Sequence, residues 1–189
     1  MSTNTVLALV GSLRAESTNQ KLAEAIQLNA PEQVEVLIHE SLGNIPFYDE
    51  DIDVEGQVPA AAAALRAAAN EADTLLLVTP EHNGTVPASL KNAIDWLSRP
   101  YGAGALTGKP TAVVGTAFGQ FGGVWAQDEA RKAVGIAGAQ VLEDAKLAVP
   151  GSLVRFAELH PKDDAEVVEQ IKGVFDAITA AQPAAQPAA

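Results

Sequence analysis

Apolar residues in this chain form short unbroken runs, which alternate with segments that repeat at helical spacing. The clearest run is residues 6–10, which contain no polar residue. A strand without polar alternation is typical of a parallel sheet that is covered by helices on both faces. The same reasoning predicts further strands at residues 34–38, 73–79, 109–116 and 140–150, the last with an interruption near Asp144.

The segments between these runs predict helices. Apolar residues recur at helical spacing over residues 22–30, and Thr18 or Asn19 is placed to cap this helix. Residues 42–55 are expected to be irregular, since they contain Pro46 and an acidic run. Helical periodicity also predicts helices over residues 58–71, 86–97, from the glycines at 122–123 to about 137, and from Asp163 or Asp164 to 178.

Alternating strands and helices predict an α/β fold, a three-layer sandwich with a five-stranded parallel sheet between helices. In the flavodoxin-like strand order 2-1-3-4-5, the first and third strands flank the switch in strand order, and the fourth lies beside the third. Ligands of such sheets bind where loops leave the carboxyl ends of the strands. The loops after these three strands are therefore expected to form one site.

Composition limits the classes of binding partner and the cellular compartment that we expect for this protein. The 189 residues predict one domain over residues 1–180, followed by an Ala/Pro/Gln-rich tail over 181–189 that we expect to be disordered. The net charge of −12 disfavours nucleic acids and anionic membranes as partners. The chain has no cysteine, which excludes disulfides, thiolate metal sites and cysteine nucleophiles. Without a recognisable signal or membrane segment, a cytoplasmic protein is expected.

The loop after the first strand carries groups that suit a phosphate monoester. Ser12, Ser17, Thr18 and Asn19 can donate hydrogen bonds, and Arg14 can present a planar fork to two phosphate oxygens. The following helix adds unpaired N–H groups at its N-terminus. The alternative is an ordinary loop whose serines cap the helix and whose arginine is solvated. Neither a Walker A nor a G-x-G-x-x-G pattern is present, so a nucleoside triphosphate is not indicated.

Two further loops, at residues 80–87 and 116–123, are rich in turn residues and polar groups. Their backbone N–H and C=O groups, with glycines that permit close approach, suit a flat ring with polar edges. Flavin mononucleotide (FMN) has this shape. Its phosphate is expected on the first loop and its ring between the second and third. The three histidines, at 39, 82 and 160, have no metal-ligand spacing, so no metal site is expected.

Five motifs in this order and spacing point to one family. They are Gly11-Ser12-Leu13-Arg14 with Ser17 and Asn19, then residues 45–51, then 80–84 with Pro87, then 90–99, and finally Gly122-Gly123. The chain resembles the NADPH-dependent FMN reductases, the flavodoxin-like quinone and chromate reductase group, over about residues 5–178. The motifs are weak individually but specific together.

The resemblance implies a set of cofactor-binding residues. The residues expected to hold the phosphate are Ser12, Arg14, Ser17, Thr18 and Asn19. The residues expected to line the ring are Pro80, Glu81, His82, Asn83 and Gly84. The residues expected at the other edge of the ring are Ala117, Gly119, Gly122 and Gly123. The family commonly has tyrosine at the position of His82 and often serine at that of Ala117. No side chain is expected to be catalytic, because FMN carries the chemistry. His82 is either a helper that contacts the ring or donates a proton, or a solvent-facing turn residue.

The implied activity is hydride transfer from NADPH or NADH to bound FMN, and then reduction of a quinone or similar small acceptor, such as free flavin, chromate or an azo compound, by a ping-pong mechanism. Family members pair through the helix matching residues 86–98, so a homodimer or homotetramer is expected. The alternative from another class is a flavodoxin-type electron carrier, although such carriers commonly lack an arginine like Arg14 in the first loop. A protein that keeps the fold but binds no flavin is a third possibility.

Overall fold

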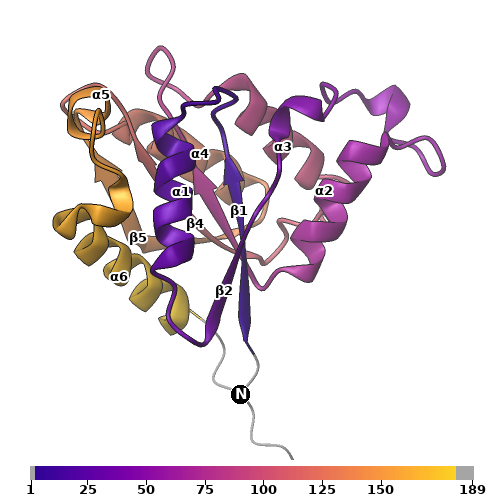
Figure 1. Ribbon diagram of the computed structural model, residues 1–189. Coiled ribbons are helices and arrows are strands. Elements are labelled where there is room, and N and C mark those ends of the chain that lie inside the picture. Colours follow the sequence, from indigo (N-terminus) through magenta and orange to yellow (C-terminus); the bar gives the residue numbers. More distant parts are fainter. Residues whose placement is uncertain (1–2, 182–189) are drawn as a thin grey trace, which may run out of the picture.

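The computed structural model of the protein describes residues 3–181 and contains a five-stranded sheet of order β2-β1-β3-β4-β5. All neighbouring strands are parallel. The predicted α/β fold and strand order are therefore confirmed (Figure 1). The strands are β1 (Asn4–Val10), β2 (Val34–Ile38), β3 (Thr74–Val78), β4 (Pro110–Thr116) and β5 (Gln140–Val149).

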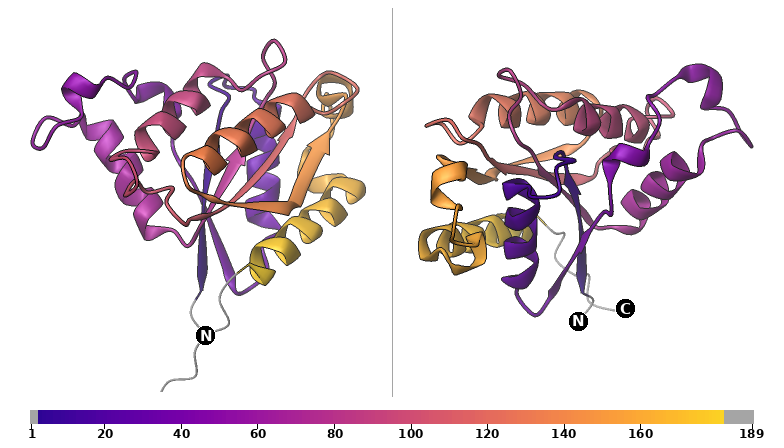
Figure 2. Two further views of the ribbon diagram at one scale, coloured as in Figure 1. Left: turned by 180° about the vertical axis from the view of Figure 1, so that it is seen from behind. Right: turned by 45° about the horizontal axis from the view of Figure 1, so that its top comes forward.

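Helices cover both faces of the sheet, as Figures 1 and 2 show. One face carries α1 (Thr18–Leu28) and α6 (Ala165–Ala180), and the other carries α2 (Ala60–Glu71), α3 (Ala88–Leu97) and α4 (Val124–Ile136). A short helix that was not predicted, α5 (Ser152–Arg155), follows β5. Of the two candidate caps for the last helix, the structure uses Asp164, whose side chain accepts from the N–H groups of Glu166 and Val167.

Strand β1 shows why its sequence lacks polar alternation. Val6, Ala8 and Val10 belong to the core beneath α1 and α6, whereas Leu7 and Leu9 belong to the core beneath α2, α3 and α4. None of these five side chains is more than 6% exposed. Alternate residues of one strand thus fill two separate cores, so every position has to be apolar.

The predicted interruption of the fifth strand is confirmed. Pairing between β4 and β5 shifts register between Thr111, which faces Val141, and Val113, which faces Lys146. The buried guanidinium of Arg131 donates from Nη2 to the carbonyl of Val113 over 2.7 Å, at the end of this irregular stretch. Burial lowers the pKa of Arg131, and the carboxylate of Asp128 opposes that shift.

The irregular segment after β2 is attached to α3. It contains two short 3-10 turns, Leu42–Asn44 and Glu50–Ile52. Asn92 of α3 donates to the carbonyls of Ile45 and Pro46, and its oxygen accepts from the backbone N–H of Tyr48. The fully buried Trp96 also donates to the Pro46 carbonyl. Two motifs behind the family resemblance, residues 45–51 and 90–99, therefore pack against each other.

Residues 182–189, which make up most of the expected tail, lie outside the described residues, so the boundary at residue 180 remains a prediction. Over residues 3–181, no helix is long and apolar enough to cross a membrane. The same residues contain no cluster of His, Asp and Glu that could hold a metal ion.

Candidate cofactor-binding site

The loops that follow β1, β3 and β4 lie together at the carboxyl edge of the sheet, which is at the top in Figure 1. Backbone hydrogen bonds align the three strand ends. The N–H of Gly11 donates to Val78, that of Thr79 donates to Val114, and that of Ala117 donates to Val149. A cavity of about 650 Å³ opens between the loops, and it also reaches Ser152 and Leu153 at the start of α5.

The first loop ends in a capped helix. Ser17 is the N-cap of α1, and its Oγ accepts from the backbone N–H of Gln20 over 3.1 Å. The expectation that Thr18 or Asn19 caps this helix is therefore wrong. Ser17 has the extended backbone of a cap residue, whereas Thr18 and Asn19 are already helical. The hydroxyl proton of Ser17 remains available to a ligand, and both Ser17 and Thr18 line the cavity.

Asn19 joins two elements that are far apart in sequence. Its Nδ2 donates to the carbonyl of Thr116 over 2.8 Å, and its Oδ1 accepts from the Thr116 N–H over 3.0 Å. The side chain is only 3% exposed, although it also lines the cavity. Asn19 thus fixes the start of α1 to the end of β4. Its expected contact with a phosphate remains a prediction.

Arg14 is the cation that borders the cavity. It is exposed, and its guanidinium makes no hydrogen bond or ion pair with the residues described, 3–181. Ser12 lines the same space. An unpaired guanidinium, the hydroxyls of Ser12, Ser17 and Thr18, and the free N–H groups of the α1 N-terminus form a donor set that suits a phosphate monoester.

The second loop is a tight hairpin. His82 and Thr85 exchange backbone hydrogen bonds of 3.0 and 3.1 Å across Asn83 and Gly84, whose φ angles are 54° and 76°. Positive φ at both central residues is typical of a type I′ turn, for which Asn-Gly is a preferred sequence. Of the five predicted ring-lining residues, Pro80, Glu81 and His82 line the cavity, whereas Asn83 and Gly84 form the exposed tip.

Glu81 connects the second loop to the third. Its Oε2 accepts from the backbone N–H of Ala126 over 3.3 Å, in the first turn of α4. The N-cap position of α4 is Gly123, which offers no side chain for capping. Glu81 therefore supplies the missing acceptor from another loop. The sequence predicted Glu81 near the ring but did not indicate this link.

The third loop contributes Ala117 and Phe118 to the cavity wall. Gly119 is exposed, whereas Gly122 and Gly123 are buried. A Cβ on Gly122 would lie 2.7 Å from the carbonyl carbon of Ala148, and its φ is 63°, so this position requires glycine. Gly122 thus brings the loop against β5. Whether Gly119, Gly122 and Gly123 contact the ring remains a prediction.

Several cavity-lining residues were missed by the sequence analysis. Ser152 and Leu153 follow the fifth strand at the same edge, so the rule used for the other three loops would have found them. Gly11, Leu13, Pro87 and Thr116 lie in the quoted motifs or loops but were not assigned to the cofactor, and no sequence signal marked Ala88 and Ser89.

The cavity fits FMN in size and chemistry. Ligand sites of this kind typically have volumes of about 300–1,000 Å³. One end offers the donors described above for a phosphate, and the other end lies between the hairpin and the third loop. A flat ring system can lie there against backbone groups and the apolar Phe118 and Leu153, which are 67% and 51% exposed.

Comparisons with known proteins point to one family. Residues 4–153 match the family model described as NADPH-dependent FMN reductase. The chain is 46% identical over 129 residues to a quinone reductase from Pseudomonas putida, an alignment that covers 68% of each protein. It is 40% identical over 126 residues to a 2-hydroxy-1,4-benzoquinone reductase from Burkholderia sp, with 67% of each protein covered.

A solved structure with the same fold is that of FerB, a flavoenzyme NAD(P)H:(acceptor) oxidoreductase from Paracoccus denitrificans. It matches with a TM-score of 0.78 and 28% sequence identity, and the match covers 94% of this chain and 98% of that one. The fold, the cavity and the sequence relatives agree, and the chain belongs to the NADPH-dependent FMN reductase family.

Proposed function

We propose that this protein is an FMN-dependent NAD(P)H oxidoreductase that reduces a quinone or a similar small acceptor by a ping-pong mechanism. Free flavin, chromate and azo compounds are further acceptors within the proposal. The observation that carries it is the cavity at the carboxyl edge, where an unpaired Arg14 and the start of α1 face a hairpin and a glycine-rich loop. The quinone reductases among its relatives support this choice of acceptor.

The residues have distinct tasks in this proposal. Ser12, Arg14, Ser17 and Thr18 bind the phosphate, and Glu81 keeps the second and third loops at a fixed separation. Bound FMN would supply the redox chemistry, the transfer of two electrons and a proton from the nicotinamide to the acceptor. His82 lines the cavity from the exposed base of the hairpin, where its imidazole can contact the substrate or supply a proton to a reduced quinone.

The first test is an anaerobic absorbance spectrum of the FMN-loaded protein, before and after NADPH and then after a quinone. Loss of the flavin band on NADPH and its return on quinone are the expected result. A flavin spectrum that neither NADPH nor NADH changes would instead identify an electron carrier. The reciprocal of the initial rate is then plotted against the reciprocal of the NADPH concentration at several fixed quinone concentrations. These plots should give parallel lines, which is the pattern of a ping-pong mechanism.

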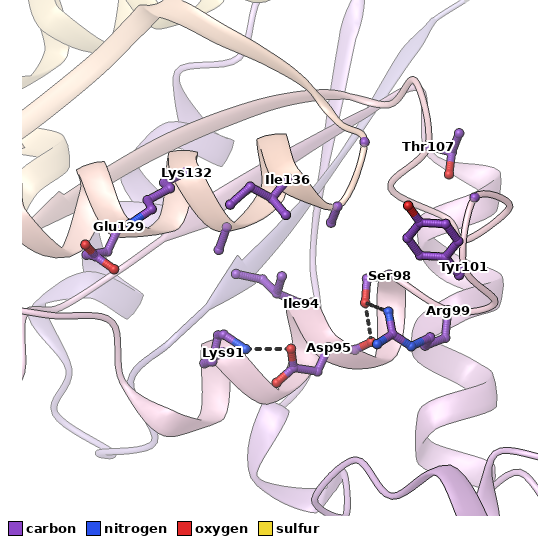
Figure 3. Close-up of a pocket in the computed structure, with 14 residues that line it drawn as sticks. Lys91, Ile94, Asp95, Ser98, Arg99, Tyr101, Thr107, Glu129, Lys132 and Ile136 are labelled. Carbon is purple, nitrogen blue, oxygen red and sulfur yellow. Dashed lines mark hydrogen bonds and ion pairs between the residues drawn. The ribbon is translucent and has the colours of Figure 1, made fainter.

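The proposal includes a homo-oligomer formed through α3 and α4. A groove of about 630 Å³ runs between these helices, and Figure 3 shows Ile94 of α3 and Ile136 of α4 beside it. Ile136 is 79% exposed and Tyr101, at one end of the groove, is 93% exposed. Exposed apolar side chains that gather along one groove are typical of an interface.

The charges of the groove favour a second copy of this chain as its partner. Its charged lining residues include Lys91 and Asp95 of α3 together with Glu129 and Lys132 of α4, so both helices carry both signs. Such a surface is complementary to itself across a two-fold axis, because each patch can meet its opposite on the other copy. A homodimer, or a homotetramer built from it, and a cytoplasmic location are both parts of this proposal.

A further inference from the structure

A second, smaller cavity also borders the first loop. It has a volume of about 180 Å³. His39, Glu40 and Ser41 enter it from the end of β2, and Ser12 and Arg14 from the loop, with Gln20 of α1 beside them. Ser12 and Arg14 also line the large cavity, so this short segment forms a common wall between the two. None of the sequence motifs singled out His39.

His39 has an unsatisfied polar atom inside the protein. Its backbone N–H donates to the carbonyl of Ala8, which fixes the residue beside the end of β1. Its Nδ1 is buried and has no hydrogen-bond partner among residues 3–181. Buried polar atoms are rarely left in this state without a functional or structural reason.

Burial and a neighbouring charge have opposite effects on the pKa of His39. Burial lowers the pKa of His39, and the carboxylate of Glu40 partly counteracts that shift. Arg14 also lines the small cavity, and it is the cation with which a phosphate on the first loop would pair. With no anion on the loop, His39 is therefore kept neutral at neutral pH.

We propose that His39 takes up a proton when the phosphate of FMN occupies the first loop, and that this protonation tightens phosphate binding. The phosphate brings up to two negative charges to the Ser12–Arg14 segment that both cavities share and pairs with Arg14, which favours a cation at His39. An imidazolium can donate to the carboxylate of Glu40 or to the hydroxyl oxygens that line the small cavity. His39 is thus a positioning residue behind the phosphate site, and the inference rests on FMN being the cofactor.

The direction of the pH dependence follows from linkage. A ligand that raises the pKa of a group binds with proton uptake, so its affinity increases as the pH falls. The increase begins near the pKa of His39 in the complex and ends near its pKa in the free protein, which lies below the ordinary value of 6.5. Each unit by which phosphate raises this pKa corresponds to a gain in affinity of about tenfold.

The test compares FMN with riboflavin, which has the same ring but no phosphate, in the parent protein and in His39→Gln. Dissociation constants are measured from about pH 5 to about pH 8, the range in which histidine titrates. The phosphate of free FMN also titrates there, which affects the measurements on both proteins alike. We expect the preference for FMN over riboflavin to increase more in the parent as the pH falls. His160→Gln is the matched control, since His160 contacts Glu24 on α1 and lines neither cavity.

A second measurement does not depend on a variant. The His39 Cε1 proton is followed by NMR against pH in the parent protein, with and without saturating inorganic phosphate or FMN. A titration midpoint that moves to higher pH with either ligand supports the inference. A midpoint that stays in place, or a pH profile for FMN that is the same in parent and His39→Gln, overturns it.

The absorbance test of the proposed function distinguishes a failure of that function from a failure of the inference about His39. If NADPH reduces the bound flavin while His39 shows no linkage to phosphate, only this inference fails. If neither FMN nor phosphate binds at any pH, both fail. Urea unfolding of His39→Gln checks that the variant is folded under the conditions of the binding measurements.

Discussion

Arg14, in the first loop, and Asn19, in the first turn of α1, lie five residues apart, yet the structure gives them different tasks. Arg14 is exposed and makes no bond with the rest of the described chain, so its charge is available to a ligand. Asn19 is buried and uses its amide to hold the backbone of Thr116. Substituting each residue therefore separates loss of a ligand contact from loss of a structural link.

Arg14→Ala is expected to weaken FMN binding by about 10- to 100-fold, because hydrogen bonds to charged groups contribute about 1.5–3 kcal/mol. Riboflavin binding should change little, and so should the free energy of unfolding. Arg14→Lys keeps the charge but not the planar fork, and should fall between parent and Ala. Titrations of flavin fluorescence measure both ligands. An equal loss of affinity for riboflavin would contradict a phosphate role.

Asn19→Ala is expected to lower the stability of the protein by about 1–3 kcal/mol, because it leaves the buried N–H and C=O of Thr116 without their partner. Urea unfolding with and without FMN measures this loss. Thr18→Ala is a useful comparison, since Thr18 lines the same cavity but is not part of this link. Unchanged stability of Asn19→Ala would show that the link is not important for the fold.

At the scale of single residues, the sequence predicted which chemical groups the first loop carries better than it predicted how they are arranged. Serines, a threonine and an arginine in one loop are a local pattern, and the structure places them around one cavity. The cap of α1 was assigned one or two residues too late. The interaction that occupies Asn19 comes from Thr116, 97 residues away in the chain, and no local pattern carries that information.

Among the elements, α6 has the most elaborate N-terminus. Asp164 caps the helix, and Arg155 forms a fork with both carboxylate oxygens over 2.6 and 2.9 Å. The hydrogen bond from Arg155 is the main reason why the pKa of Asp164 is lowered. A lowered pKa in the folded state means that the stabilisation is present above the unfolded value of about 3.9 and is lost as the pH falls through the folded value.

Asp164→Ala is therefore expected to be less stable than the parent at neutral pH, by about 1–2 kcal/mol for the cap alone. The difference should narrow as the pH falls from about 4, where the carboxylate is protonated in the unfolded chain, through its lower pKa in the folded protein. Urea unfolding at a series of pH values measures this. Asp163→Ala, one residue earlier and not the cap of α6, is the matched control. A constant difference at all pH values would indicate that the charge of Asp164 does not contribute.

Element boundaries were predictable to within a few residues where the periodicity was strong, as in α6 and β4. The side chains that link elements were not. Glu81 caps α4 from another loop, and Arg131 reaches from α4 to the carbonyl of Val113 in β4. Both links depend on the register in which elements pack, and hydrophobic periodicity describes only the face that each element buries.

For the molecule as a whole, the site follows from topology. The strand order 2-1-3-4-5 brings the loops after β1, β3 and β4 to one edge, which is why three separate sequence patterns could be assigned to one ligand. The same rule extends to β5, whose following residues Ser152 and Leu153 complete the cavity. The interface of an assembly cannot be predicted in this way, because it depends on which residues of α3 and α4 remain exposed in the folded chain.

The exposed groove between α3 and α4 gives a direct test of assembly. Ile136→Glu places a charge at the apolar part of the groove and is expected to convert the proposed dimer into a monomer. Val154→Glu is the matched control, because Val154 is also 79% exposed but lies on α5, away from the groove. Molar mass from light scattering during size-exclusion chromatography measures both variants. If Ile136→Glu keeps the mass of a parent dimer, or if the parent itself is a monomer, the groove has another purpose.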